Sequence, residues 1–240
     1  MWRQAFDELI DVLLPPACAA CDDVLPTAGA FCESCEHEVV ALPTVHCRTC
    51  AEPGRFPRGL CERCRAGSIP WDIAWAPFEH EGAIAKAVHR FKYEDRSDLA
   101  RPLGMLLARD AKSHLTQMSG FLVPLPLHDA RYRHRRFDQA ALLARVLATY
   151  AKRAMKLDWL ERIRDTPRQV GLSEAAREAN VRGAFRASPN VAGHDVVLLD
   201  DVLTSGATAR EACRVLRQAG ARRVYVLTLS RARSELNGGT

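Results

Sequence analysis

Residues Val196–Thr208 read VVLLDDVLTSGAT, a stretch with three physically different parts. The unbroken apolar run Val196–Leu199 predicts a central parallel strand that is buried on both faces. Asp200 and Asp201 come where that strand ends, at the carboxyl edge where open α/β sheets bind ligands. The next residues are small and rich in hydroxyl groups, which is typical of a loop that opens a helix: Thr204, Ser205, Gly206, Ala207 and Thr208.

The chemistry of this stretch favours a sugar phosphate. Successive backbone N–H groups in a small-residue loop can point at one anion, and the positive end of the following helix adds to the attraction. The two carboxylates can accept hydrogen bonds from ribose hydroxyl groups. The loop is not a Walker A motif, because it lacks the glycine–lysine pair. The alternative is a Rossmann-like strand, turn and helix with an incidental acidic turn.

Over these thirteen positions the chain resembles the signature of type I phosphoribosyltransferases. The resemblance implies that phosphoribosyl pyrophosphate (PRPP) binds together with Mg²⁺. It assigns Asp200 and Asp201 to the 2′ and 3′ hydroxyl groups of the ribose, and Thr204–Thr208 to its 5′-phosphate.

Cysteine spacing is the second strong signal. Eight of the nine cysteines form four CxxC pairs, and all eight lie in the first 64 residues. Two-residue spacing lets both thiolates of a pair reach one tetrahedral ion, and two pairs complete a Cys₄ site. We therefore expect two structural zinc ions. Pairing consecutive motifs makes two ribbons and is favoured here, whereas interleaved pairing would make a cross-braced module. The predicted ligands are Cys18, Cys21, Cys32, Cys35, Cys47, Cys50, Cys61 and Cys64.

Disulfides, a redox role and other metals are the competing interpretations of these cysteines. The opening residues MWRQAFDELIDVLLPP carry three acids and do not resemble a secretory signal. No stretch has the length of a transmembrane helix. We therefore expect a cytoplasmic chain with reduced thiols, which favours metal over disulfides. Cys213 stands apart on the helix after the loop, where a buried structural thiol is expected.

The net charge gives only weak support for nucleic-acid binding. The formal charge is +5 with neutral thiols. Each zinc ion with four thiolates contributes about −2, so two sites bring the net charge to about +1.

The 240 residues predict two parts. Residues 1–68 would hold an amphipathic helix, 2–14, and the double zinc ribbon, and residues 69–240 would form the α/β domain. Strands that alternate with helices predict a parallel sheet covered on both faces. The expected strands are 73–80, 121–127, 196–199 and 224–229, and the expected helices are 82–91, 99–115 and 139–154, with one more after the loop and a stop at Gly220.

Cysteine pairs ahead of such a domain resemble the ComF family, also described as GntX-like or amidophosphoribosyltransferase-like. Four further stretches carry this resemblance, which spans essentially the whole chain. They are His89–Tyr93 with Asp98–Ala100; Pro124–His128 with Arg131, Arg135, Phe137 and Gln139–Ala140; Arg162, Arg164, Thr166, Gln169 and Leu172; and Arg177, Asn180 and Gly183–Phe185. Two positions depart from the family pattern: Arg136 stands in place of a glycine, and Asp138 in place of an asparagine.

The resemblance implies a type I phosphoribosyltransferase fold behind an N-terminal double zinc ribbon. The implied activity is Mg²⁺-dependent transfer of a phosphoribosyl group. His128, Arg131 and Arg135 would form the pyrophosphate side, and residues 162–172 resemble a lid that closes over the site. No residue stands out as a base for the acceptor. A PRPP-binding regulator and a vestigial site therefore remain alternatives to an active transferase.

The family resemblance also implies a role in natural competence, the uptake of single-stranded DNA. Its implied partners are a competence helicase and other uptake proteins, with a peripheral location at the inner membrane. Residues 131–137, RYRHRRF, mix cations with aromatic rings, as single-strand binders do. A pyrophosphate site or a solvated loop would explain the same residues. The oligomeric state stays open.

Overall fold

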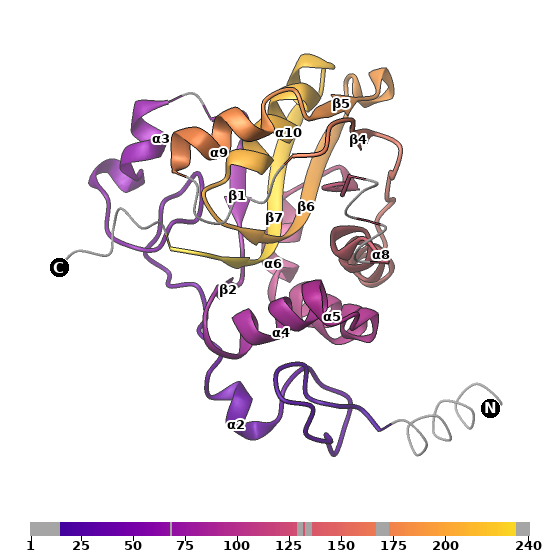
Figure 1. Ribbon diagram of the computed structural model, residues 1–240. Helices are drawn as coiled ribbons and strands as arrows, with labels where there is room; N and C mark the ends of the chain where they lie inside the picture. The colour runs from indigo at the N-terminus through magenta and orange to yellow at the C-terminus, as the bar shows by residue number, and fades with distance from the viewer. Residues whose placement is uncertain (1–14, 68, 129–131, 133–135, 167–172, 234–240) are drawn as a thin grey trace.

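A parallel sheet forms the centre of the molecule (Figure 1). The computed structural model describes residues 15–67, 69–128, 132, 136–166 and 173–233, so the predicted helix 2–14 lies outside the described residues. Within the sheet every strand pair is parallel, which confirms the predicted fold class. The strand order is β1 (Ile73–Trp75), β7 (Arg223–Arg231), β6 (Asp195–Leu203) and β3 (Phe121–Pro124), and β2 (Phe78–Glu79) also pairs with β7.

Side chains of β6 alternate between two cores, because successive residues of a strand point to opposite faces. Val197 and Leu199 belong to the core that includes helices α4, α5 and α8. Val196 and Leu198 belong to the core that includes α10. The apolar run is therefore buried on both faces, as predicted. The bounds are α4 Gly82–Tyr93, α5 Ala100–Asp110, α8 Gln139–Ala151, α9 Glu174–Val181 and α10 Ala207–Gln218.

Several predicted elements are shorter in the structure than expected. The predicted strand 73–80 divides into β1 and β2, with Ala76 and Pro77 between them. The predicted helix 99–115 divides into three elements: the 3-10 turn η2 (Ser97–Leu99), α5 and α6 (Lys112–Gln117). The helices α5 and α6 meet at Ala111. β3 ends at Pro124 because a proline cannot donate to the next strand, and a second proline follows at Pro126.

A small antiparallel pair, β4 (Leu160–Arg162) and β5 (Phe185–Ala187), was not predicted. Two of the family-like stretches meet beside it. The guanidinium group of Arg164 donates to the carbonyl oxygens of Asn180 and Arg182, at 2.9 and 2.6 Å. The 3-10 turn η3 (Pro189–Val191) then leads to β6. Residues 167–172 of the predicted lid lie outside the described residues.

The two cysteine-rich segments are structural repeats of each other. In the first, the N–H of Cys18 donates to the Asp23 oxygen at 2.8 Å, and in the second the N–H of Cys47 donates to the Glu52 oxygen at 2.8 Å. Each repeat also contains a residue with positive φ, Asp22 in the first and Ala51 in the second. The first ends in α2 (Glu33–Glu36); the second holds η1 (Pro57–Gly59) and α3 (Glu62–Ala66).

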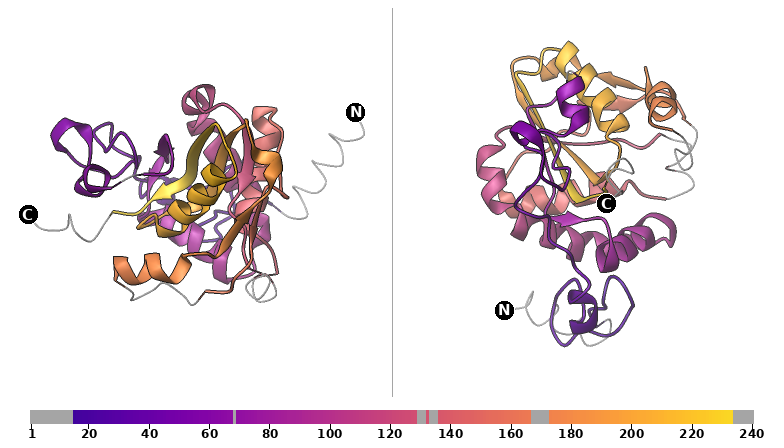
Figure 2. Two further views of the ribbon diagram at one scale, coloured as in Figure 1. Left: turned by 90° about the horizontal axis from the view of Figure 1, so that it is seen from above. Right: turned by 90° about the vertical axis from the view of Figure 1, so that its left-hand side faces the viewer.

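The two ribbons join different cores on opposite faces of the sheet. Cys18 and Cys35 pack into the core of α4, α5 and α8, whereas Cys47, Cys50 and Cys61 pack into the core of α10. In the right-hand view of Figure 2 the first ribbon lies at the lower end of the molecule, and the second lies higher, beside the sheet. In the described part of the chain no helix has both the length and the apolar character needed to cross a bilayer.

Candidate functional site

The eight cysteines of the CxxC motifs form two clusters. Within each cluster the four Sγ atoms lie within 4.8 Å of one another. Consecutive pairing of the motifs is thereby confirmed: Cys18, Cys21, Cys32 and Cys35 form site 1, and Cys47, Cys50, Cys61 and Cys64 form site 2. Four thiolates at this separation fit one tetrahedral zinc ion and leave no open position for catalysis. Both sites are therefore structural.

The adjacent acids lie inside β6, near its carboxyl end, because the strand continues through Val202 to Leu203 instead of ending at Leu199 as predicted. Their surroundings differ. The Asp201 carboxylate is 7% exposed and lies 2.6 Å from the ammonium group of Lys92, at the end of α4. Burial, followed by the negative charge of Asp201, raises the pKa of Asp200 to about 8. Asp200 therefore favours its protonated form near neutral pH.

His80 lies at the same edge of the sheet, directly after β2. Its Nδ1 atom is 3.0 Å from the hydroxyl oxygen of Ser230 on β7. Burial, followed by the positive charge of Lys92, lowers the pKa of His80, so the ring is neutral near pH 7. The carboxyl edge therefore offers an uncharged imidazole beside the acid pair.

The loop after β6 turns its carbonyl oxygens toward arginine side chains. The guanidinium group of Arg231 donates to the oxygens of Leu203 and Thr204, at 2.8 and 2.6 Å. The oxygen of Ser205 accepts from Arg63 at 3.1 Å and from Arg210 at 2.9 Å. In a trans peptide the N–H group points away from the carbonyl group. The amides of residues 204, 205 and 206 therefore point to the other side of the loop.

Gly206 then begins α10 in the left-handed conformation, with φ 79°. A side chain at this position would be strained and would approach the ring of Trp71 and the guanidinium group of Arg210 to 3.4 Å. The start of α10 adds its positive end to the three amides. Amides and a helix start in this arrangement can attract an anion such as a phosphate.

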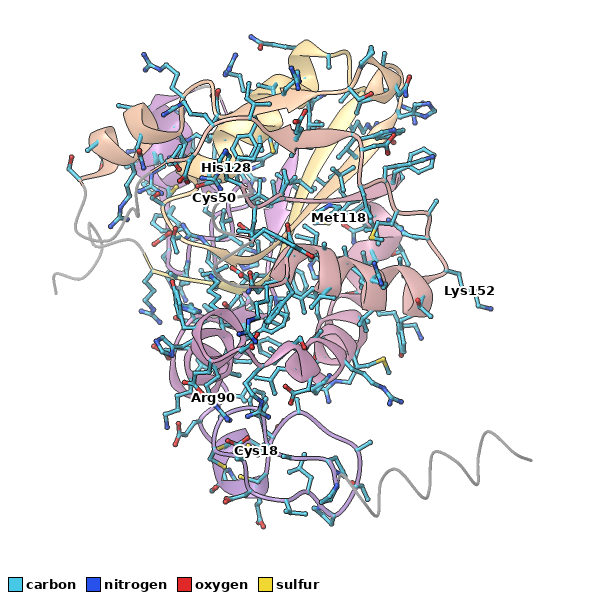
Figure 3. All side chains as sticks on the ribbon, turned by 45° about the vertical axis from the view of Figure 1, so that its right-hand side comes forward. Cys18, Cys50, Arg90, Met118, His128 and Lys152 are labelled. Atoms are coloured by element: carbon cyan, nitrogen blue, oxygen red, sulfur yellow. The ribbon has the colours of Figure 1, made fainter. Side chains whose placement is uncertain are left out.

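The residues predicted for pyrophosphate are only partly described, because Arg131 and Arg135 lie outside the described residues. The ring of His128 is partly buried, with Nδ1 3.9 Å from the Asp165 carboxylate. Asp138 anchors this segment, since its carboxylate accepts from the N–H of Leu127 at 3.0 Å and from that of Ala141 at 2.9 Å. Figure 3 shows His128 in the upper half of the molecule, away from Cys18 and Arg90 at its lower end.

Sequence reasoning missed Lys92 and His80 as parts of the site. Lys92 belongs to a family-like stretch, but nothing in the sequence indicates a contact with an acid more than one hundred residues later. His80 carries no motif at all. The parallel pairing of β2, β7 and β6 brings His80 to the edge where Asp201 lies, and the end of α4 brings Lys92 there.

Comparisons with known proteins agree with both halves of this description. A family model described as a phosphoribosyl transferase domain matches residues 138–237. One described as a double zinc ribbon domain matches residues 9–65. Among solved structures, the chain is similar to a glutamine PRPP amidotransferase from B. subtilis complexed with ADP and GMP. That likeness has 26% identity and a TM-score of 0.39, and covers 57% of this chain and 30% of the other.

Two relatives are similar over most of the chain. The DNA utilization protein YhgH of Salmonella typhimurium is 32% identical over 189 residues, which cover 77% of this chain and 83% of that protein. Competence protein F of Haemophilus influenzae is 28% identical over 211 residues, which cover 85% and 91%. With a double zinc ribbon ahead of a phosphoribosyltransferase-type domain, the chain belongs to the ComF family.

Proposed function

We propose that the chain binds PRPP with Mg²⁺ at the carboxyl edge of the sheet and transfers its phosphoribosyl group to an acceptor. One observation carries the proposal: two adjacent acids lie near the carboxyl end of a central strand, and the loop that follows this strand has amides that face away from three arginine-bound carbonyl groups. Acids of this kind suit ribose hydroxyl groups, and amides of this kind suit a phosphate.

Each residue then has a defined task. Asp201, paired with Lys92, accepts a hydrogen bond from a ribose hydroxyl group, and Asp200 binds the neighbouring one. The amides and hydroxyl groups of Thr204–Thr208 hold the 5′-phosphate. His128, Arg131 and Arg135 face the pyrophosphate. Mg²⁺, when bound, neutralises charge on the pyrophosphate and keeps several of its waters.

The reaction breaks the bond between ribose C1 and a pyrophosphate oxygen and forms a bond between C1 and the acceptor. Pyrophosphate leaves with the bonding electron pair, while positive charge develops on the sugar. The protein contributes by positioning the ribose and by neutralising the leaving group. His80 is a candidate base that takes the acceptor's proton, because it follows β2 at the same edge of the sheet and its pKa is lowered by burial.

A second candidate function is a PRPP-responsive protein of DNA handling that does not turn PRPP over. Its support is the set of relatives, which includes proteins named for DNA utilization and for competence. In this case the partners are single-stranded DNA, a competence helicase and other uptake proteins, at a cytoplasmic location on the inner membrane. The partly described segment 131–137 is the proposed contact with the DNA strand.

Calorimetric titration of PRPP with Mg²⁺ into the zinc-loaded protein tests the site. We expect micromolar binding, and we expect the double variant Asp200→Asn with Asp201→Asn to lose it while keeping its zinc and its fold. An exposed acid, Asp158, supplies the control: Asp158→Asn should bind like the parent chain. Retained affinity in the double variant would place the ribose elsewhere.

Turnover separates the two candidate functions. Pyrophosphate release that depends on a nucleobase, an amine or an oligonucleotide supports the transferase. Salt-sensitive binding of single-stranded DNA, with PRPP bound and never consumed, supports the second function.

A further inference from the structure

In each zinc ribbon, an arginine from outside the ribbon donates to backbone carbonyl oxygens of the ribbon and pairs with one of its acids. In the first ribbon, Arg90 of α4 donates to the carbonyl oxygens of Cys18 and Ala19 and pairs with Asp22. In the second, Arg231 at the end of β7 donates to the carbonyl oxygen of Cys50, at 3.1 Å, and pairs with Glu52. Both ribbons are thus held by an arginine that donates to their backbone and pairs with an acid. Other contacts that only one of these arginines makes are therefore informative.

The difference is that Arg231 also holds the phosphate loop. Besides its bonds to the second ribbon, it donates to the carbonyl oxygens of Leu203 and Thr204. Arg231 is 1% exposed and Glu52 is 2% exposed, so this ion pair lies in the interior. A buried ion pair is a costly way to gain stability, since an apolar pair of similar size often does as well. The guanidinium group is instead suited to holding several carbonyl groups at once, because its donors are fixed in one plane.

A second connection runs through α3 of the same ribbon. Arg63, one residue before the zinc ligand Cys64, donates to the carbonyl oxygen of Ser205. Behind the loop, the indole N–H of Trp71 donates to the oxygen of Thr49, at 2.8 Å. The same indole ring would lie 3.4 Å from a Cβ atom placed on Gly206, so it packs against the loop at that residue. The second ribbon therefore contacts the back of the loop directly through Arg63 and indirectly through Thr49 and Trp71.

We propose that the second zinc ribbon is the back wall of the phosphate site, and that Arg231 and Arg63 are positioning residues that aim the loop amides at the 5′-phosphate of PRPP. The identity of the ligand, PRPP, rests on the proposed function. The coupling between the ribbon and the loop is independent of that function. Held carbonyl groups leave the opposed N–H groups preorganised, which strengthens anion binding without any new contact to the ligand. Loss of zinc from site 2 releases Cys50, Glu52 and Arg63, and the loop with them.

The first ribbon supplies the contrast. Its described fasteners go to α4 and the turn after it: Arg90, Lys86 with Glu38 at 2.8 Å, and Arg96 with Asp22 at 2.6 Å. In Figure 3 Cys18 lies beside Arg90 at the lower end of the molecule, while Cys50 lies in the upper half. Equal changes in the two ribbons should therefore have unequal effects on the loop.

Hydrogen–deuterium exchange of residues 203–210 tests the coupling without any ligand. We expect Arg231→Met to speed exchange in this segment by about tenfold, and Arg90→Met, the matched change in the first ribbon, to leave it unchanged. Cys47→Ser, after loss of one zinc ion, should speed the same segment. Unchanged exchange at 203–210 in a folded Arg231→Met or Cys47→Ser protein would overturn the proposal.

PRPP titration then tests the effect on binding. We expect Arg231→Met to weaken PRPP by about tenfold or more, Arg231→Lys to recover only part of the loss, and Arg90→Met to bind like the parent. Glu52→Gln offers a milder variant should Arg231→Met fail to fold, and it should speed exchange in the same segment. If the parent protein binds no PRPP, the proposed function is wrong. The coupling between ribbon and loop is then still decided by the exchange experiment, which uses no ligand. Equal PRPP affinity in parent and Arg231→Met would overturn the positioning role.

Discussion

Asp200 has the most perturbed carboxyl group of the candidate site. Its pKa is raised to about 8, first by burial and then by the negative charges of Asp201 and Asp138. Lys92 opposes that rise with its positive charge. Asp138 itself has a raised pKa, caused first by its burial. The site without ligand therefore concentrates acids that a bound cation or ribose would stabilise.

Asp200→Asn should stabilise the ligand-free protein in a pH-dependent way. The pKa of Asp200 lies above its ordinary value of 3.8, so stability from its proton is complete below about pH 4 and is lost as the pH rises toward 8. Asparagine has no charge to bury. The advantage of the variant in urea unfolding should grow by about 1–3 kcal/mol between pH 5 and 7.5, given ~1.4 kcal/mol per pK unit. An advantage that is constant with pH would contradict this.

The two departures from the family pattern are accommodated locally. Arg136 has φ 64°, a left-handed conformation that a glycine adopts without strain, and its guanidinium group pairs with Asp95 at 2.8 Å. Asp138 caps α8 as an asparagine side chain can, through an oxygen that accepts from the N–H of Ala141.

Among the elements, α5 and α8 make the closest helix contact around the first core. Leu103 and Leu107 of α5 and Leu143 and Leu147 of α8 are all fully buried. Gly104 lets the two backbones approach: a Cβ atom there would lie 2.7 Å from the Cβ atom of Val146. The pair supports the sheet face on which Val197 and Leu199 lie, and with it the strand that ends at the acids.

Gly104→Ala should destabilise the protein by about 1–3 kcal/mol, although alanine is the better helix former. The cause is steric, so removing the neighbour should help. Denaturant unfolding of the double variant Gly104→Ala with Val146→Ala should recover part of the loss, and the coupling between the two changes should be favourable. If the loss in the double variant equals or exceeds the sum of the losses in the two single variants, crowding at this contact is not its source.

The whole molecule is organised by the sheet, which separates the two ribbons. Cys18 and Cys47 are both fully buried, each in a different core. The predicted division into residues 1–68 and 69–240 stays a prediction, because both ribbons share their cores with the sheet. Zinc therefore supports the main body of the protein as well as the ribbons.

Metal analysis of the purified protein should find about two zinc ions per chain, and Cys18→Ser should hold about one. Chelation should lower the thermal midpoint of the whole molecule in one transition, because the ribbons and the sheet share cores. A Cys18→Ser protein with both ions would remove Cys18 from the ligands. A separate, early transition for the ribbons would show that the cores do not depend on them.

Local sequence patterns were enough for the parts whose physics is local. A run of four apolar residues predicts a strand buried on both faces, CxxC spacing predicts shared tetrahedral ions, and Gly220, with φ 94°, ends α10 as expected. The anion site at Thr204–Thr208, which also follows from local composition, stays a prediction. In each case the deciding contacts join residues that are close in the chain, or that repeat at a fixed spacing.

Tertiary structure alone brought Lys92 to Asp201 and Arg231 to the phosphate loop. These contacts join residues 109 and 27–28 positions apart, so they depend on strand order and register rather than on any local pattern. Arg231 follows a strand of ordinary composition, and Glu52 resembles any exposed acid in a zinc ribbon. Their burial is set by the packing of the second ribbon against the sheet. A charge acquires its partner, its pKa and its role from that packing, which a sequence pattern does not encode.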